Sequence, residues 1–383
     1  MKARVVTIGA VGLGLGLSAL SVGCADTERD PLPEYPGPLS GSGGTAAASA
    51  GSGGGGSGPL GCVTDTEPSP TPNAVVGELT VQLPSDGCGK AYPCADVGLR
   101  SLLTEGRKAS DCADMLEDGT PKCGSWSAQR RFVVYLPPGY DPAKPYPLVI
   151  EGPGCGGGAT DVYSLANGQS TVIRVGIAPG PNSTGHATNP QQGCFDDHEG
   201  DDSIDWVFYE QLYDKLNAEL CFDRHRVFVG GHSSGGALAN QLSGKYAGDS
   251  IRPVRGALVY GAVVPTEPAQ LPTFSDAPIA GIWLHELANM TTPFENTERA
   301  VSRAMQLAHC PGGDYQHAQL EDFPIGAGMP DSTCQRLSGC DSLYPLVVCP
   351  LAGHAQGIHD SQVNPAFTEF LRLFGKEPLI TMP

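Results

Sequence analysis

Positive charge is scarce in this chain. The 383 residues include 23 Lys and Arg against 41 Asp and Glu, so the formal net charge is −18. A protein that binds nucleic acid neutralises phosphates with a basic surface, so this composition argues against a nucleic-acid partner. Such acidity is typical of a protein that stays soluble outside the cell, and it does not select a substrate.

Metal-ligand spacing and internal repeats are also missing. Cys24 is followed by twelve cysteines, no two of which form a C-x-x-C pair or a zinc-like cluster with histidine. The acidic run 196–202 lacks the alternating ligands of a calcium loop, and it leads into a helix, whose N-terminus favours acidic residues. We therefore expect neither a metal nor another cofactor. The even number of cysteines predicts disulfides; their pairing stays open, with Cys112 to Cys123 and Cys334 to Cys340 as plausible short loops.

The first 73 residues are expected to carry no chemistry. A short basic start precedes an apolar, glycine-rich run that ends at Cys24, the pattern of a secretory signal that is too short to span a membrane. Its end resembles a bacterial lipobox with the leucine one place early, so residues 1–24 are interpreted as a lipoprotein-type signal peptide with Cys24 lipidated. The alternative is an ordinary signal peptide cut nearby. Residues 25–73, rich in Gly, Ser and Pro, cannot bury enough apolar surface to fold and are interpreted as a disordered tether.

Residues 74–383 have the length of one large α/β domain. Strand-like and helix-like segments alternate in them, as in a mostly parallel sheet with helices on both faces. Strands are expected at 130–136, 147–150, 172–178, 227–229, 256–263, 279–284 and 346–349. Helices are expected at 203–220 with Asp202 or Ser203 as cap, directly after Ser233, at 296–308 and at 364–374.

The segment 226–240 reads as a strand, a tight turn and a helix with Ser233 at the apex. The run 227–229 suits a buried strand, and the Ala- and Leu-rich residues from Ala237 favour a helix packed on it. Between them, Gly231 to Gly235 matches the G-x-S-x-G of a nucleophile elbow, where glycines leave room for a strained serine whose hydroxyl points out above the sheet. The alternative is a plain turn, because a chain with 52 glycines can contain this motif by chance.

The chain resembles the polyhydroxybutyrate depolymerase and feruloyl esterase group of α/β-hydrolases, which are secreted serine esterases. The strongest match runs from Leu220 to Gly236, where the group shows a cysteine, an aspartate and an arginine before the elbow. The other matching segments are Gly87 to Lys90, Arg131 to Tyr140, Pro147 to Gly158, Asp205 to Asn240, Leu284 to Cys310 and Val347 to His354. The resemblance implies an α/β-hydrolase fold in which nucleophile, acid and histidine follow one another along the chain.

The resemblance also implies the oxyanion hole and the general base. The group's His-Gly-Cys-Gly-Gly loop corresponds to residues 151–158, with Pro153 in place of the histidine. The N–H groups of Cys155 and Ser234 would then hold the oxyanion, although a disulfide-braced turn is an alternative that does not exclude this role. His354 is the expected base, with His359 as its rival. The histidines expected to be structural are His225, His232, His285 and His309, of which His232 should line the cleft.

The acid of the triad departs from the group's pattern. Where the group places an aspartate, four residues after a histidine, this chain has Asn289. Asparagine offers no charge to stabilise an imidazolium, and in a serine protease this exchange costs about 10⁴-fold in turnover. We therefore predict that Glu286 orients His354. The alternatives are that Glu286 is a solvated loop charge, or that the more remote Glu295 supplies the carboxylate.

These assignments predict an exported serine esterase that works through an acyl-enzyme. The expected substrates are feruloyl or acetyl esters on plant polysaccharide, or polyhydroxyalkanoate-type esters, a choice that the resemblance alone supplies. We expect a monomer attached to a membrane only through its N-terminal lipid. The competing hypothesis is a surface-displayed binding lipoprotein that kept the fold and lost the chemistry, and Pro153 and Asn289 favour it.

Overall fold

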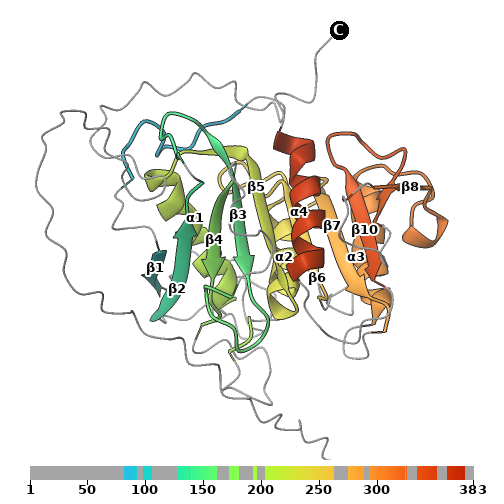
Figure 1. Cartoon of the computed structure of the whole chain (residues 1–383), viewed down its shortest axis with the longest axis horizontal. Helices are drawn as coiled ribbons and strands as arrows, with labels where there is room; N and C mark the ends of the chain where they lie inside the picture. Colours follow the sequence, from blue (N-terminus) through green and yellow to red (C-terminus); the bar gives the residue numbers. More distant parts are fainter. Residues whose placement is uncertain are drawn as a thin grey trace, which may run out of the picture. The chain divides into compact units, whose positions relative to one another are not determined.

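The folded part of the chain is built around one large sheet (Figure 1). The computed structural model describes residues 82–92, 98–105, 127–137, 139–161, 172–180, 193–195, 203–262, 275–288, 293–323, 325, 334–351 and 360–375. The expected signal peptide with Cys24 and the expected tether lie outside these residues. None of the described helices is long and apolar enough to cross a membrane.

The middle of the ten-stranded sheet is parallel. Its strands lie in the order β1-β2-β4-β3-β5-β6-β7-β10-β9-β8. The parallel strands, in spatial order, are β4 (Ile173–Ile177), β3 (Tyr146–Gly152), β5 (Phe222–His232), β6 (Gly256–Tyr260), β7 (Ala280–Glu286) and β10 (Leu346–Leu351). The antiparallel strands at the two edges are β1 (Gly98–Glu105) with β2 (Ser127–Tyr135), and β9 (Gln335–Leu337) with β8 (Leu320–Asp322). The predicted mostly parallel sheet is confirmed.

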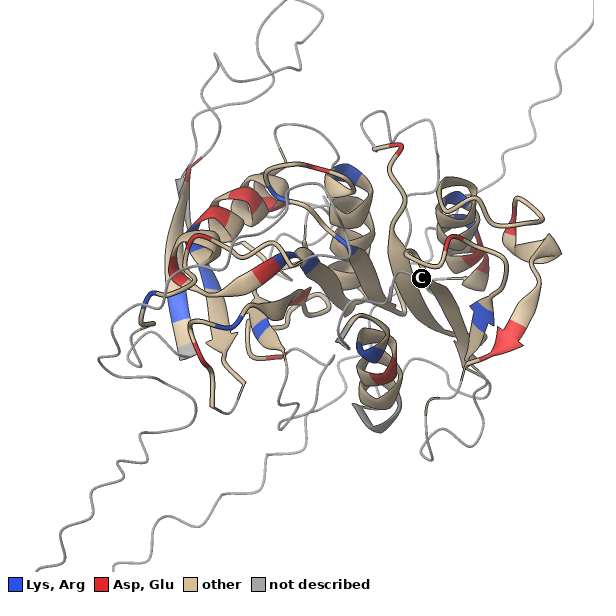
Figure 2. Ribbon diagram, turned by 90° about the horizontal axis from the view of Figure 1, so that it is seen from above, with Lys and Arg blue, Asp and Glu red and all other residues tan. Residues whose placement is uncertain are grey.

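Helices cover both faces of this sheet (Figures 1 and 2). One face carries α1 (Ile204–Glu219), α2 (Ser234–Tyr246) and α3 (Phe294–Leu307), and the other carries α4 (Asp360–Gly375). The short 3-10 helix η4 (Tyr315–His317) follows α3. Side chains alternate along a strand, so Val227 and Val229 pack into the core on the side of α1, α2 and α3. Phe228 points to the other face, where its ring centroid lies 5.0 Å from that of Phe374 on α4. The central strands are therefore buried on both sides, which explains their unbroken apolar runs.

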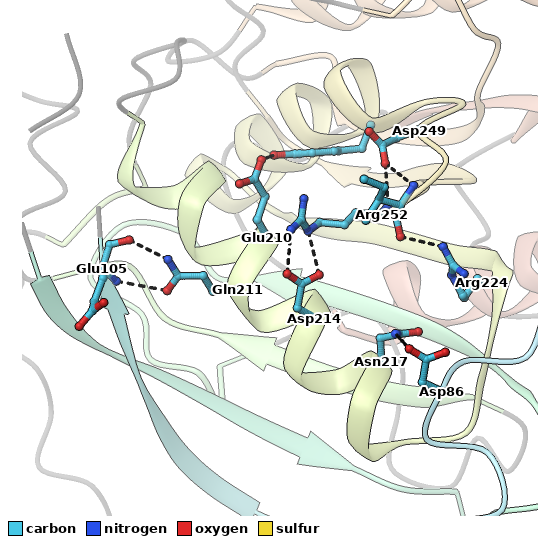
Figure 3. A network of polar contacts seen from close by, with 11 residues as sticks. Asp86, Glu105, Glu210, Gln211, Asp214, Asn217, Arg224, Asp249 and Arg252 are labelled. Carbon is cyan, nitrogen blue, oxygen red and sulfur yellow. Dashed lines mark hydrogen bonds and ion pairs between the residues drawn. The ribbon is translucent and has the colours of Figure 1, made fainter. Parts of the chain in front are cut away.

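Polar contacts fix α1 against the end of α2 and the loop that joins α2 to β6 (Figure 3). Arg252 donates two hydrogen bonds to Asp214, at 2.9 and 2.7 Å, and the Tyr246 hydroxyl donates to Glu210 at 2.7 Å. Asp249 accepts from two backbone N–H groups of its own turn, at 2.7 and 2.6 Å. This loop leads into the start of β6, so the contacts stand at the edge of the parallel sheet opposite to the end of β5.

Four disulfides brace the described residues: Cys88–Cys221, Cys155–Cys194, Cys310–Cys340 and Cys334–Cys349. The suggested pair of Cys334 and Cys340 is wrong. Cys334 precedes β9 and Cys349 lies on β10; the pairing of these strands brings the two Cα atoms to 4.0 Å. Cys112 and Cys123 lie outside the described residues. Disulfides of this number indicate that the protein folds in an oxidising environment.

The first described segment, 82–92, lies along the beginning of β5. Its Ser85 N–H donates to the Phe222 carbonyl at 2.8 Å, and the Arg224 N–H of β5 donates back to Leu83 at 2.8 Å. The disulfide between Cys88 and Cys221 closes the same contact covalently. The amino end of the central strand is thus tied to a segment more than a hundred residues earlier in the chain, since the two cysteines are separated by 133 positions.

Candidate active site

Ser233 stands at the turn between β5 and α2, as predicted. Its backbone has φ 51° and ψ −117°, a combination that residues other than glycine rarely adopt. Its N–H donates to the Tyr260 carbonyl of β6 at 3.0 Å, and its own carbonyl accepts from Ala237 at 2.9 Å. The neighbouring strand and the first turn of α2 therefore hold the serine in its strained conformation.

Glycine is required on both sides of this serine. A Cβ added to Gly231 would lie 2.4 Å from the carbonyl oxygen of Gly152, and one added to Gly235 would lie 2.1 Å from the same oxygen. Both are backbone contacts far below van der Waals distance, so no side-chain rotation could relieve them. The glycines of G-x-S-x-G thus serve the packing of the elbow against the end of β3.

The glycine-rich loop 153–158 follows β3 and lies directly beside the elbow. The Gly235 N–H donates to the Pro153 carbonyl at 3.0 Å. A Cβ on Gly154 would stand 2.9 Å from Nδ1 of His232 and 3.4 Å from Cβ of Ser233. The loop thus approaches both neighbouring residues of the turn. Ser234 is the first residue of α2, where a backbone N–H has no partner within the helix, so the elements that carry both predicted oxyanion donors meet next to Ser233.

Glu286 is the last residue of β7, and its side chain is buried. The residue is 2 % exposed, and its Oε1 accepts a hydrogen bond of 2.6 Å from the Tyr260 hydroxyl. A Cβ on Gly261 would lie 3.3 Å from Oε2 of Glu286 and 3.8 Å from Nε2 of His232, so both side chains face this glycine. The interpretation of Glu286 as a solvated loop charge is therefore wrong. Glu286 lies opposite Leu351 of β10, at the strand end from which the chain continues towards His354.

Burial sets the protonation of the two rings around this carboxylate. Burial lowers the pKa of His232 to about 4, and the nearby Glu286 carboxylate opposes the shift only in part. Burial, together with the hydrogen bond to Glu286, raises the pKa of the Tyr260 hydroxyl well above its ordinary value. At neutral pH the imidazole of His232 is uncharged and Tyr260 is a donor. Sequence reasoning missed Tyr260, although its place at the carboxyl end of the strand beside the elbow could have drawn attention to it.

Of the remaining predicted site residues, His285 and Glu295 belong to the part of the chain that the structure describes, whereas the others do not. His285 is buried between β7 and α3, with Nδ1 2.7 Å from the Thr297 hydroxyl oxygen, which fits the structural role expected for it. Glu295 is an exposed residue in the first turn of α3. His354, its rival His359 and Asn289 lie outside the described residues, so the general base stays a prediction.

Comparison with known proteins gives likenesses of fold. No protein-family model and no curated protein matches the sequence. Among solved structures, the chain resembles esterase 2 of Thermogutta terrifontis phosphonylated by cyclosarin at 13% identity and a TM-score of 0.38, over 71% of this chain and 94% of that chain. The same esterase phosphorylated by paraoxon gives 12% identity and a TM-score of 0.40, over 73% and 95%. Esterase PE8 gives 15% identity and a TM-score of 0.41, over 60% and 93%. Identities and scores this low assign no activity, so the function is argued from the site.

Proposed function

We propose that this protein is a serine hydrolase of carboxylic esters that works through an acyl-enzyme. The observation that carries the proposal is the backbone of Ser233, held at φ 51° and ψ −117° between a buried strand and a helix N-terminus. Strain of this kind persists only where the surroundings enforce it, and it is concentrated at functional sites. A plain turn would not need glycine at both 231 and 235 to pack against the backbone of the neighbouring strand β3.

In the proposed reaction, the Ser233 hydroxyl oxygen forms a bond to the ester carbonyl carbon. His354 takes the hydroxyl proton and then gives it to the leaving alcohol as the ester C–O bond breaks. The N–H groups of Cys155 and Ser234 stabilise the oxyanion, because loop 153–158 and the start of α2 converge beside the serine. Water then attacks the acyl-enzyme with His354 again as base, which releases the acid and restores the serine.

Glu286 is the proposed acid of the triad. It offers a buried carboxylate at the carboxyl end of β7, and the hydrogen bond from Tyr260 fixes the direction of that carboxylate. Its pairing with Leu351 places it beside the strand that precedes the segment of His354. A fixed carboxylate at this place would select the imidazole tautomer that can accept the serine proton. Asn289 then needs no catalytic role.

The proposed substrates are feruloyl or acetyl esters on plant polysaccharide, or polyhydroxyalkanoate-type esters. This choice rests on the sequence resemblance. The four disulfides support an exported enzyme, and lipidation of Cys24 would keep it at the cell envelope.

The test is hydrolysis of p-nitrophenyl acetate, methyl ferulate and polyhydroxybutyrate by the wild type and Ser233→Ala. We expect ester hydrolysis by the wild type, its loss in the variant, and labelling of Ser233 by a fluorophosphonate probe. Equal rates in the two proteins would contradict the mechanism. Absence of labelling on folded wild type would instead support a binding lipoprotein that has lost its chemistry.

A further inference from the structure

The segment 193–195 is bound to the oxyanion loop by a covalent link and a hydrogen bond. Cys194 forms a disulfide with Cys155 in the middle of the loop, and the neighbouring Gly156 N–H donates to the Gly193 carbonyl at 3.2 Å. The loop has glycine at 154, 156, 157 and 158, and glycine loses more conformational entropy on ordering than any other residue. Without such links, holding the loop in one conformation would cost a large amount of conformational entropy.

The same segment also contacts the elbow and the end of β3. The Phe195 N–H donates to the Ser234 hydroxyl oxygen at 3.4 Å. Phe195 is 3 % exposed, and its ring lies so close to Gly152 that an added Cβ would stand 2.5 Å from Cε2. Segment 193–195 therefore contacts every part that the proposed oxyanion hole needs: the loop, the start of α2 and the end of β3, from which the loop begins.

We propose that residues 193–195 position the oxyanion hole and that the Cys155–Cys194 disulfide makes ester hydrolysis depend on the oxidation state of this pair. Cys194 and Phe195 are then positioning residues, which act through the N–H of Cys155. The inference rests on the proposed function. Its physical basis is that an oxyanion hole accelerates acyl transfer only when its donors are already in place as charge develops.

Among the disulfides of the residues that the structure describes, exposure favours this one for reduction. Cys155 is exposed, whereas both cysteines of Cys88–Cys221 and of Cys334–Cys349 are buried, and Cys340 of the fourth pair is half-buried. Thiol exchange requires a thiolate to reach a sulfur atom, so access sets the order in which disulfides are reduced. A dithiol would attack the Cys155 sulfur, release Cys194 as a thiol, and then free the Cys155 thiol as it closes to its own cyclic disulfide. The pair gains two electrons and two protons, and the dithiol loses them.

The first experiment compares the oxidised wild-type chain with Cys155→Ser/Cys194→Ser on p-nitrophenyl acetate. Removal of a single oxyanion donor lowers kcat by about 10²–10³-fold. Since the freed loop still visits the active position, we expect kcat to fall about 10- to 100-fold while KM changes less than about twofold, because the donors act on the transition state. The matched control is Cys310→Ser/Cys340→Ser, which removes a disulfide between the end of α3 and the loop before β10 and should keep kcat at the wild-type value.

The second experiment titrates the folded wild type with dithiothreitol. Loss of kcat should follow the appearance of alkylatable thiols at Cys155 and Cys194, and the double serine variant should show no further loss. The titration of the wild type itself does not depend on the folding of any variant. Wild-type kcat in the folded double variant, or loss that follows another cysteine pair, would overturn the proposal while leaving Ser233-dependent hydrolysis intact. If the wild type is no faster than Ser233→Ala, the proposed function and this inference both fail.

Discussion

Gly235→Ala should disrupt the elbow, although it adds one methyl group. The new Cβ would stand 2.1 Å from the carbonyl oxygen of Gly152, 2.4 Å from its carbonyl carbon and 2.6 Å from the carbonyl oxygen of Pro153. Ordinary van der Waals contact begins at 3.4 Å, so the start of α2 and the end of β3 must separate by about 3.4 − 2.1 = 1.3 Å. All three atoms belong to the backbone, so the shift moves the elements that carry Ser233 and the oxyanion loop.

Two magnitudes follow from this separation. Overpacking costs about 1–3 kcal/mol of unfolding free energy, which the better helix propensity of alanine offsets by up to about 1 kcal/mol. A displacement of about 1 Å at the reacting groups costs about 10²-fold in rate. We therefore expect a variant that folds with a modest loss of stability and hydrolyses p-nitrophenyl acetate about 100-fold more slowly than the wild type.

The matched control is Gly158→Ala in the oxyanion loop. A Cβ there meets only the Asp161 carboxylate, at 3.7 Å, so kcat should stay within about twofold of the wild type. Initial rates and urea denaturation measure both variants. If Gly235→Ala is folded and keeps wild-type kcat, the close approach of α2 to β3 is not needed for catalysis and the reasoning fails.

Three further predictions concern Glu286, His232 and Arg252. Glu286→Gln keeps the shape of the side chain but removes its charge, so kcat should fall by up to about 10⁴-fold and fluorophosphonate labelling should slow in parallel. If kcat is unchanged in this variant while Asn289→Asp raises it, Glu286 is not the acid. The pKa of His232 is about 4 in the folded protein against an ordinary 6.5, so between these pH values the unfolded chain binds more protons than the folded one. The wild type should therefore lose on the order of 2 kcal/mol of unfolding free energy from pH 7 to pH 4, and His232→Gln should not show this loss. Parallel pH profiles of the two proteins in urea denaturation would refute this. Arg252→Ala removes two hydrogen bonds to Asp214 at the edge away from Ser233, so it should cost about 0.5–1 kcal/mol in thermal unfolding and leave kcat unchanged, and a large loss of rate would contradict that separation.

The parallel core was predictable because its strands are buried on both faces. The apolar run Val227 to Val229 predicts a strand from its own residues, without knowledge of the neighbouring strands. The same holds for the buried strands β3, β4, β6 and β7. β8 has three exposed residues. Exposure alternates along β1, but the exposed positions include Leu99 and Leu103, so its sequence does not alternate apolar inward residues with polar outward ones. These edge strands exist because of neighbours that pair with them, and pairing partners distant in sequence leave no local pattern.

In the candidate site, too, local features were predictable from the sequence and contacts between distant segments were not. The position of Ser233 was fixed by a local motif, whereas the burial of Glu286 under Tyr260 depends on two strands side by side. Pairing of Cys155 with Cys194 likewise bridges 39 positions. The suggestion that joined Cys334 to Cys340 used short separation as its only guide, and β9 instead brought Cys334 to Cys349. Separation along the chain alone therefore does not decide which cysteines the strands bring together.

The tie between segment 82–92 and the beginning of β5 has a mechanical consequence. A pull on the chain ahead of residue 82 would enter the domain through Cys88–Cys221, at the amino end of a central strand, and would be resisted in shear by its two flanking strands. An edge strand, by contrast, has only one neighbour and can be peeled away one hydrogen bond at a time. β5 has 11 residues, at about 3.3 Å each, so the point of traction and Ser233 lie about 35 Å apart at opposite ends of one strand. The end of β5 that carries Ser233 is therefore the end farther from the segment that such a pull would load.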